Sequence, residues 1–404
     1  MGRPIALAGG GLAAHLRADR TVIERTNGAE AVAWDAEGRL LTDQVGRCVL
    51  RRGLSGRFLL RERAGAGGRP LDAGEEGEVI ERTLRIARDA ADRLEGSDAG
   101  PEERRELVER LARILSRDAA RYAEDARRFN RIWKPIPILP PDRGLALVAQ
   151  GTEGCSWGRC LFCGLYPDGS FRVKGEEEFA RHIRDALSFL GRSALTRNAL
   201  FFGDGDPFAA PDRLLLPLVD RLLAEMDAAA RRGDPVPLTR DLYAFARLST
   251  LAGRDAASLA AYGRRGFRRL YIGVETGDPE LYAILRKPGD SGELPRAVRA
   301  VHEAGMRVGL IFLAGVGGRR FRASHRAGTI RLLERVEPRE GDLVYLSPIV
   351  ETPGSGYRIW MEEEGIEPLG EDEMEKEART LMEGIRARSG RAKVAFYPLR
   401  SFVY

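Results

Sequence analysis

Cysteine is scarce in this chain, with four residues among 404, and this excludes a small domain held together by several disulfides. No apolar run approaches the roughly 20 residues that a membrane-spanning helix requires, because arginine or glycine interrupts the most apolar stretches. The opening segment, MGRPIALAGGGLAAHL, contains an arginine, a histidine and consecutive glycines, all unsuited to an export signal. We therefore expect a folded, cytoplasmic protein.

The chain also has little net charge, because 65 basic residues and 60 acidic residues leave a surplus of only +5. No run of basic residues gathers on one predicted face, so nucleic-acid binding is possible but not indicated. With 43% hydrophobic and 31% charged residues the composition is that of ordinary globular proteins. At roughly 100 to 200 residues per domain, the length predicts two or three domains.

The first third of the chain changes from a strand pattern to a helix pattern. Residues 1–72 contain short β-prone runs separated by glycine and asparagine, which predict a small β-rich region. Within them, Gly9–Ala14 matches a dinucleotide-binding fingerprint, but no βαβ unit follows, and we interpret it as a turn. Residues 73–133 predict a helical segment. Residues 134–144 are a proline-rich linker.

Beyond the linker, apolar runs alternate with helical patterns. Six such runs in residues 145–358, each followed by a helical pattern, predict an α/β fold: a parallel sheet curled into a partial (β/α)6 TIM-like barrel. Residues 359–404 are predicted to be a C-terminal extension that covers the barrel. In such barrels the chemistry gathers at the carboxyl ends of the strands, so those positions are the candidates for a functional site.

Three of the four cysteines follow the first predicted barrel strand: Cys155, Cys160 and Cys163. Three thiolates can bind three irons of a [4Fe–4S] cluster and leave the fourth iron open to a ligand. A zinc site would need a fourth ligand, for which only distant Cys48 or a histidine is available. Incidental buried cysteines are the remaining alternative.

This loop resembles the signature of the radical S-adenosylmethionine (SAM) superfamily, which is C-x3-C-x2-C with an aromatic residue before the third cysteine. Phe162 holds the aromatic place, and the spacing here is C-x4-C-x2-C, one residue longer. Further similar segments follow in the same order across residues 145–350. The resemblance implies a radical SAM barrel with one [4Fe–4S] cluster and SAM as cofactors.

By this resemblance, the segment Gly203–Asp206 after the second strand holds the amino group of SAM, with an aspartate as the acidic residue. Arg247 and Ser249 are expected on one face of the third strand, and Glu275 at the end of the fourth, where they would contact the SAM ribose and carboxylate. Leu313 lies on the strand expected to pack against adenine. The predicted cofactor-binding residues are Phe162, Gly203, Asp204, Gly205, Asp206, Arg247, Ser249, Glu275, Arg286 and Leu313.

Each of these segments also has an interpretation without SAM. The alternative for Gly203–Asp206 is a glycine–aspartate turn, for Glu275 a buried glutamate with only structural bonds, and for the strand of Leu313 plain barrel core. The resemblance implies an oxygen-sensitive enzyme that cleaves SAM to methionine and a 5′-deoxyadenosyl radical, which abstracts hydrogen from an unidentified substrate. It also implies a low-potential electron donor such as flavodoxin or ferredoxin. Because only Cys48 remains, a second all-cysteine cluster is excluded. The alternative functions are an iron–sulfur electron carrier or sensor, an RNA-modifying member and a tetrapyrrole-pathway member.

Overall fold

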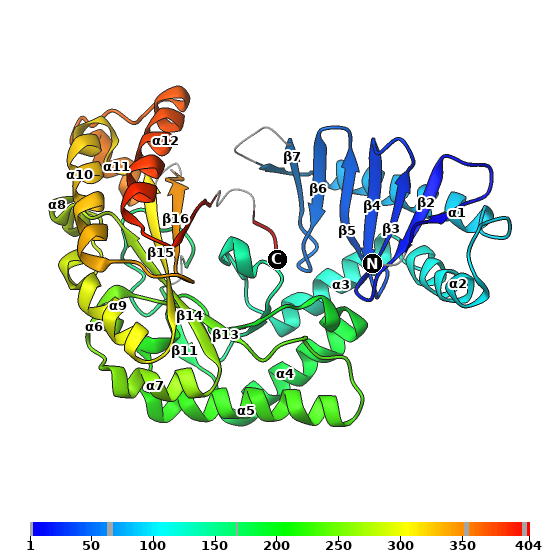
Figure 1. Ribbon diagram of the computed structural model, residues 1–404, viewed down its shortest axis with the longest axis horizontal. Helices are drawn as coiled ribbons and strands as arrows, with labels where there is room; N and C mark the ends of the chain where they lie inside the picture. The colour runs from blue at the N-terminus through cyan, green and yellow to red at the C-terminus, as the bar shows by residue number, and fades with distance from the viewer. Residues whose placement is uncertain (1–2, 63–67, 167–168, 351–354, 398–401) are drawn as a thin grey trace.

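A computed structural model of the chain describes all residues except 1–2, 63–67, 167–168, 351–354 and 398–401. Two large sheets organise it: an eight-stranded sheet at the N-terminal end and a seven-stranded parallel sheet in the rest of the chain (Figure 1). Among the described residues, no helix is long and apolar enough to cross a membrane.

The N-terminal sheet is a meander in which each strand pairs antiparallel with the next. Its inner face buries Trp34 and Val32 against Leu84 and Leu107 of two helices. The three glycines of the suspected fingerprint form a turn that leads into a strand rather than a helix. The strands are β1 (Ile5–Ala6), β2 (Leu12–Leu16), β3 (Arg20–Arg25), β4 (Glu30–Asp35), β5 (Leu40–Val45), β6 (Cys48–Arg52), β7 (Phe58–Glu62) and β8 (Gly68–Pro70).

Three helices follow: α1 (Ala73–Asp92), α2 (Pro101–Leu115) and α3 (Ala119–Ile132). A capping box starts α1, because Asp72 accepts from the Glu75 amide while Glu75 accepts from the Asp72 amide. The first two helices pack on the N-terminal sheet. In contrast, Phe129 of α3 and the following Trp133 belong to the core of the parallel sheet. The helical segment therefore contributes to both cores.

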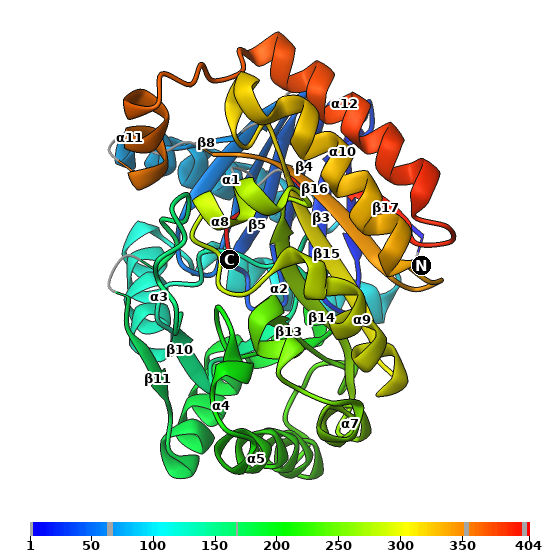
Figure 2. The ribbon, with the colours of Figure 1, turned by 90° about the vertical axis from the view of Figure 1, so that its left-hand side faces the viewer.

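The parallel sheet contains the six predicted strands in chain order, which confirms the predicted fold class, and adds a seventh strand at one edge. Helices cover its outer side (Figure 2). The strands are β9 (Leu147–Ala149), β12 (Leu200–Phe202), β13 (Leu242–Ala246), β14 (Phe267–Glu275), β15 (Arg307–Ala314), β16 (Leu343–Pro348) and β17 (Lys393–Phe396). The helices are α4 (Glu176–Leu190), α5 (Asp212–Arg231), α6 (Leu248–Ala252), α7 (Ala256–Arg264), α8 (Pro279–Ile284), α9 (Leu294–Glu303), α10 (Gly318–Val336), α11 (Gly356–Glu363) and α12 (Glu371–Arg388).

The segment expected to cover the barrel, residues 359–404, is also built into it. Strand β17 pairs with β16 and α12 packs on α10. Tyr397 donates its amide to Leu346 O at 2.8 Å and its hydroxyl to Leu139 O of the proline-rich linker. This segment therefore extends the sheet and joins it to the linker. The division of the chain into domains stays a prediction.

Strand β9 is the other edge of the parallel sheet. Trp133 donates Nε1–H to Val148 O at 2.8 Å. The Tyr404 hydroxyl donates to Ala146 O at 2.9 Å and accepts from Val148 N at 3.1 Å. Side chains from the helical segment and the tail thus satisfy backbone groups that a neighbouring strand would otherwise bind.

The amino end of the barrel is closed by the linker. Asp142 accepts from the hydroxyls of Tyr271 at 2.7 Å and Tyr345 at 2.8 Å, and from Arg269 at 3.0 Å. Arg269 and Tyr271 lie on β14, and Tyr345 lies on β16. A carboxylate bound from three directions fixes the linker across this end. Chemistry is therefore left to the carboxyl end.

His182 of α4 joins the end of β9 to the end of α3. Its Nε2 accepts from Gln150 N at 3.1 Å, and its Nδ1 lies 3.0 Å from Ile132 O. These two bonds require a neutral ring with the proton on Nδ1. Burial accordingly lowers the pKa of His182 to about 4.

We expect acidification to destabilise the protein through His182. Between about pH 6.5 and 4 the unfolded chain binds a proton at this ring that the native chain excludes, so the free energy of unfolding falls as pH falls, by ~2 kcal/mol at pH 5. Urea unfolding of the wild type and His182→Gln at neutral pH and at about pH 5 measures this loss. Arg181→Gln, which changes an exposed arginine of the same helix, is the control and should keep the wild-type dependence. Equal losses in the wild type and His182→Gln would contradict the prediction.

Candidate functional site

The three clustered cysteines lie on the loop of a small hairpin at the carboxyl end of β9. The hairpin consists of β10 (Thr152–Gly154) and β11 (Phe171–Val173), paired antiparallel. Gly154 has φ +79°, and a Cβ there would lie 1.8 Å from Ser170 O, so only glycine allows the strands to approach. The hairpin presents its loop where the predicted chemistry should occur.

Asp204, which follows β12, binds both ends of the cysteine loop. One carboxylate oxygen accepts from Gly154 N at 3.1 Å, just before Cys155, and the other accepts from the Tyr166 hydroxyl at 2.7 Å, just after Cys163. Burial raises the pKa of Asp204 to about 6, against the opposing effect of these bonds. A single side chain therefore fixes where the loop begins and ends.

The middle of the loop is held from the opposite side. Trp157 donates Nε1–H to Arg286 O at 2.8 Å, and Leu161 N donates to Leu285 O at 3.0 Å. Leu161 O in turn accepts from Tyr357 N of α11 at 3.0 Å. The cysteine loop is thus attached to the ends of β12 and α8 and to the start of α11, although Cys163 itself is exposed.

Glu275, at the end of β14, faces the same region. Its φ is +67°, which is unusual for a residue other than glycine, and a register irregularity against β15 precedes it. The Lys287 ammonium lies 2.9 Å from Glu275 Oε1 and 2.8 Å from Gly273 O. Burial opposes the ammonium charge, but Glu275 and Cys160 raise the pKa of Lys287 above its ordinary value. A buried cation therefore holds the side-chain carboxylate of a residue whose backbone conformation is unusual.

Charges from this region act on the thiol of Cys160. Its pKa is raised to about 11, mainly by burial; Lys287 opposes the rise, whereas Cys163, Glu275 and Cys155 contribute to it. Among the described residues, no three His, Cys, Asp or Glu side chains converge on a single metal ion. A [4Fe–4S] cluster is bound through three different irons, so its thiolates need not converge on one point. The thiolate donor set fits such a cluster.

Two glycines allow the loop after β12 to approach the hairpin. Gly203 has φ +75°, and a Cβ there would lie 2.7 Å from Thr152 Oγ1. A Cβ on Gly205 would lie 3.2 Å from that of Cys155. The segment Gly203–Asp206 is therefore brought against the cysteine loop, as the sequence order predicts for neighbouring parallel strands.

Arg247 and Ser249 do not lie on the third barrel strand, where the sequence predicts them. Strand β13 ends at Ala246, Arg247 caps α6 and Ser249 lies inside that helix, so the two side chains do not alternate along a strand. The expectation is wrong because the strand ends earlier than the polar pattern indicates. Arg247 instead donates to buried Asp206 at 2.8 Å, and Thr250 donates to the same oxygen at 2.7 Å. The other Asp206 oxygen has no hydrogen-bond partner within the described ranges.

The remaining predicted residues lie around the loop in different ways. Leu313 belongs to an apolar cluster with Leu281 and Leu285, and Phe162 packs against that cluster. Arg286 contributes its carbonyl to Trp157, as above. Sequence reasoning missed Tyr166, Lys287 and Thr250 as site residues. Tyr166 lies three residues after Cys163, and Lys287 follows Arg286 directly, but the carboxylate that each binds depends on tertiary contacts that the sequence pattern does not specify.

Residues 150–333 match the family model of the Radical SAM superfamily. An uncharacterized protein of Methanopyrus kandleri is 27% identical over 217 residues, which are 50% of this chain and 40% of that protein's length. The chain thus matches less than half of this relative.

Solved structures with a similar chain path include methylornithine synthase PylB, with a TM-score of 0.40, 18% identity and coverage of 71% of this chain and 81% of that one. Coproporphyrinogen III oxidase HemN from Escherichia coli has a TM-score of 0.41 and 15% identity, over 65% and 56% of the two chains. HydG, a maturase of the [FeFe]-hydrogenase, has a TM-score of 0.41 and 14% identity, over 78% and 65%. These likenesses are too distant to transfer an activity.

We expect Tyr166→Phe to loosen the cysteine loop. It removes a hydrogen bond to a charged group, and a loss of ~1.5 kcal/mol corresponds to about tenfold faster amide exchange if the loop opens locally. Hydrogen exchange of peptides that cover residues 154–166 in the full chain measures the effect. Tyr282→Phe, whose hydroxyl binds Pro288 O at 3.2 Å, is the control. Unchanged protection in Tyr166→Phe would show that Asp204 does not hold the loop.

Proposed function

Because residues 150–333 match the family model of the Radical SAM superfamily, we propose that the chain is a radical SAM enzyme that binds one [4Fe–4S] cluster and SAM at the carboxyl end of the parallel sheet. The observation that carries this proposal is the set of Cys155, Cys160 and Cys163 on one loop, which Asp204 and Trp157 anchor at the carboxyl end of the sheet. Three thiolates leave one iron of such a cluster open. The bound cluster would supply the electron that cleaves SAM to methionine and a 5′-deoxyadenosyl radical.

The protein's own residues would bind and orient SAM. We assign the SAM amino group to the Gly203–Asp206 segment and the ribose hydroxyls to Glu275. Both Asp204 oxygens already accept one hydrogen bond, but each carboxylate oxygen has a second acceptor site. Lys287 prevents Glu275 from turning away. Such fixed polar groups need little reorganisation when a charged ligand arrives.

The other predicted residues would shape the surroundings of SAM. Arg247 holds Asp206 through a short ion pair, which leaves one Asp206 oxygen for a ligand. Phe162 and Leu313 would contribute apolar surface, and Ser249 and Arg286 would line the same end of the sheet. Exclusion of water and oxygen then depends on the segments around this end. We keep the predictions of a cytoplasmic location and of a low-potential electron donor; the structure assigns no substrate.

The cluster assignment predicts opposite behaviour for two cysteines. After anaerobic reconstitution, Cys160→Ala should lose the iron content and the brown ~400 nm absorption band, and it should form no 5′-deoxyadenosine when reduced with SAM. Cys48→Ala should keep both properties, because Cys48 lies on β6 of the N-terminal sheet. An intact cluster in Cys160→Ala would contradict the assignment. A cluster without 5′-deoxyadenosine in the wild type would favour the electron carrier or sensor instead.

The carboxylate assignment predicts weaker SAM binding in two variants. Asp204→Asn and Glu275→Gln should each lose ~1.5–3 kcal/mol of SAM affinity, the scale of a hydrogen bond to a charged group, while cluster content stays normal. Electron paramagnetic resonance of the reduced cluster during SAM titration measures the affinity. Glu280→Gln, on the exposed surface of α8, is the matched control.

Glu275→Gln leaves the buried Lys287 without its carboxylate, so the unfolding free energy of the same samples must be measured as well. Loss of stability without loss of SAM affinity would assign Glu275 to the fold. Wild-type affinity in both variants would mean that neither carboxylate binds SAM.

A further inference from the structure

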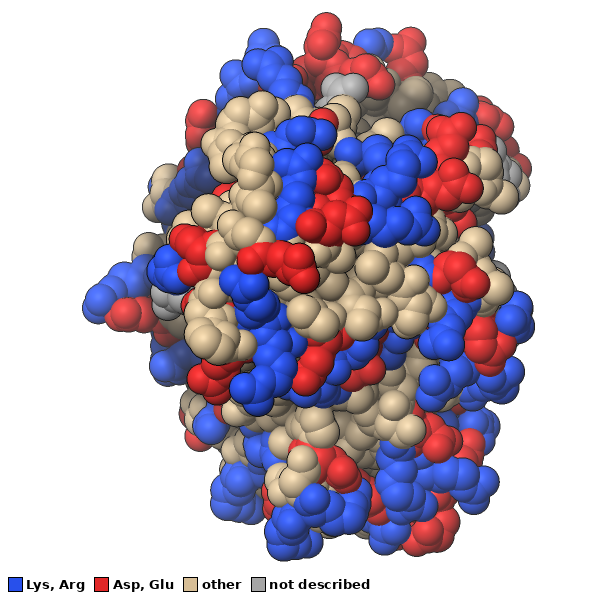
Figure 3. Space-filling model, turned by 90° about the vertical axis from the view of Figure 1, so that its right-hand side faces the viewer, with Lys and Arg blue, Asp and Glu red and all other residues tan. Residues whose placement is uncertain are grey.

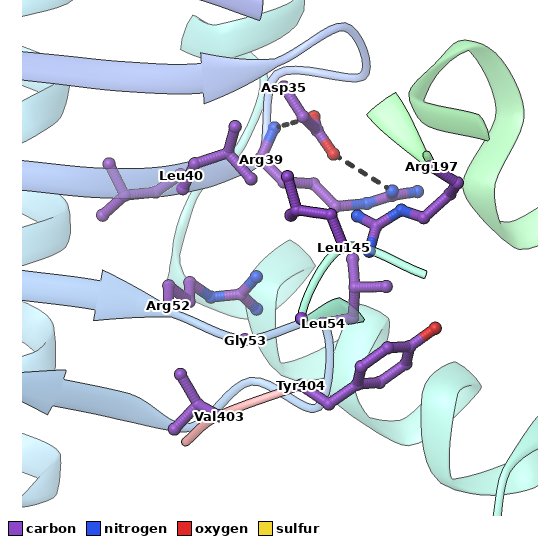
Figure 4. Close-up of a pocket in the computed structure, with 12 residues that line it drawn as sticks. Asp35, Arg39, Leu40, Arg52, Gly53, Leu54, Leu145, Arg197, Val403 and Tyr404 are labelled. Carbon is purple, nitrogen blue, oxygen red and sulfur yellow. Dashed lines mark hydrogen bonds and ion pairs between the residues drawn. The ribbon is translucent and has the colours of Figure 1, made fainter. Parts of the chain in front are cut away.

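A second polar site lies at the junction of the N-terminal sheet and the amino end of the barrel. A cavity of about 60 Å³ opens there, and three arginines and one aspartate line it: Arg39, Arg52, Arg197 and Asp35. Figure 4 shows their side chains entering this space from separate segments, with Leu54, Leu145 and Tyr404 along its walls. Arg197 precedes β12, whereas Arg52 ends β6.

All three arginines are buried, between 3% and 6% exposed. Arg39 is paired with two carboxylates, Asp35 at 3.3 Å and Asp125 at 3.4 Å. Asp125 also pairs with Arg117. Two arginines and two aspartates in this group therefore balance one another, and the charges of Arg52 and Arg197 remain.

Arg52 and Arg197 have no carboxylate within ion-pair distance in the described part of the chain. The guanidinium of Arg52 lies 4.5 Å from the ring centre of Tyr122, a contact with an aromatic face that does not neutralise it. The Nε atoms of both residues are buried without a hydrogen-bond partner among the described residues. Two buried positive charges thus border one cavity.

Arginine cannot resolve such a situation by losing its proton, because its pKa is too high, whereas a buried lysine can. A buried charge that is neither paired nor hydrogen-bonded is strongly unfavourable. Asp35 lines the same cavity but is paired with Arg39, so an anion that enters the cavity would compensate the two remaining charges. Guanidinium groups bind planar or tetrahedral oxyanions through several parallel hydrogen bonds.

The size of the cavity limits the ligand. One water molecule requires roughly 10–15 Å³ measured in this way, so about 60 Å³ accommodates a group of four or five heavy atoms. That is the size of a phosphate group, and a nucleotide would not fit inside. On the molecular face shown in Figure 3, basic and acidic side chains are intermixed, so the described residues of that face form no comparable group of basic side chains.

We propose that this cavity is a binding site for a phosphate group, held between Arg52 of the N-terminal sheet and Arg197 of the barrel. The site is separate from the cysteine loop: Arg197 and Leu145 precede β12 and β9, whereas the loop follows β9. Binding would join the two parts of the molecule by neutralising both cations. The proposal does not depend on the proposed function.

Isothermal titration of the full chain with inorganic phosphate, against chloride at equal ionic strength, tests the site. We expect one phosphate per chain and at least tenfold weaker binding in both Arg52→Gln and Arg197→Gln, equivalent to about 1.4 kcal/mol. The control Arg181→Gln changes an exposed arginine of α4 and should bind like the wild type. No binding in the wild type would overturn the proposal. Equal binding in Arg197→Gln would overturn it too, because the wild type would then bind an adventitious ion only.

Stability provides a second readout that a merely structural role would not give. Without phosphate, Arg52→Gln and Arg197→Gln should be at least as stable as the wild type, because each removes an uncompensated buried charge. With phosphate, only the wild type and Arg181→Gln should gain thermal stability. Variants that are destabilised equally in both buffers would overturn the proposal.

Two further ligands identify the source of the phosphate. Glycerol phosphate that binds as well as inorganic phosphate would indicate a group carried by a larger molecule, and its failure to bind would indicate the free ion. Acetate, with a single charge, should bind more weakly than phosphate. Acetate binding as tight as that of phosphate would overturn the assignment to a phosphate group.

Discussion

The free edge of β9 is the constraint on which the rest of the molecule depends. A parallel sheet that does not close into a full barrel leaves backbone groups unpaired at its ends. Here Trp133 and Tyr404 bind those groups of Ala146 and Val148. Because the two aromatic residues come from before the barrel and from its tail, closing the edge requires both segments. The N-terminal region is thereby docked to the barrel.

The same edge positions the cysteine loop. Gln150 lies between β9 and the hairpin, and its backbone is bound on one side by His182 at 3.1 Å and on the other by Lys174 at 2.7 Å. Asp204 then fixes the loop itself. Buried carboxylates at this end all have protein partners: Asp204 has Tyr166, and Glu275 has Lys287. Such partners reduce the unfavourable burial of each charge and also fix its direction.

Much of this arrangement could be predicted from the sequence, because local patterns carried it. Six apolar runs gave six parallel strands in order, and the cysteine spacing located the loop. Short elements were harder: β17 spans only the four residues Lys393–Phe396, none of them fully buried, so its pairing with β16 decides its existence. The placement of Arg247 failed because a strand and the first turn of a helix cannot be distinguished over so few residues. Lys287 as the partner of Glu275 depends on how α8 returns to β14, which no local pattern specifies.

Charge is distributed differently at the two ends of the parallel sheet, and this follows from how each end is built. At the carboxyl end, each carboxylate and its cation come from the same or neighbouring βα units: Glu275 binds Lys287, and Asp206 binds Arg247. At the amino end, the charges come from separate parts of the chain. Arg39, for example, donates a hydrogen bond to Phe189 O of the barrel. A junction between segments that are distant in the chain need not balance its charges. The unpaired Arg52 and Arg197 are the physical consequence, and a bound anion is the means by which such a junction becomes stable.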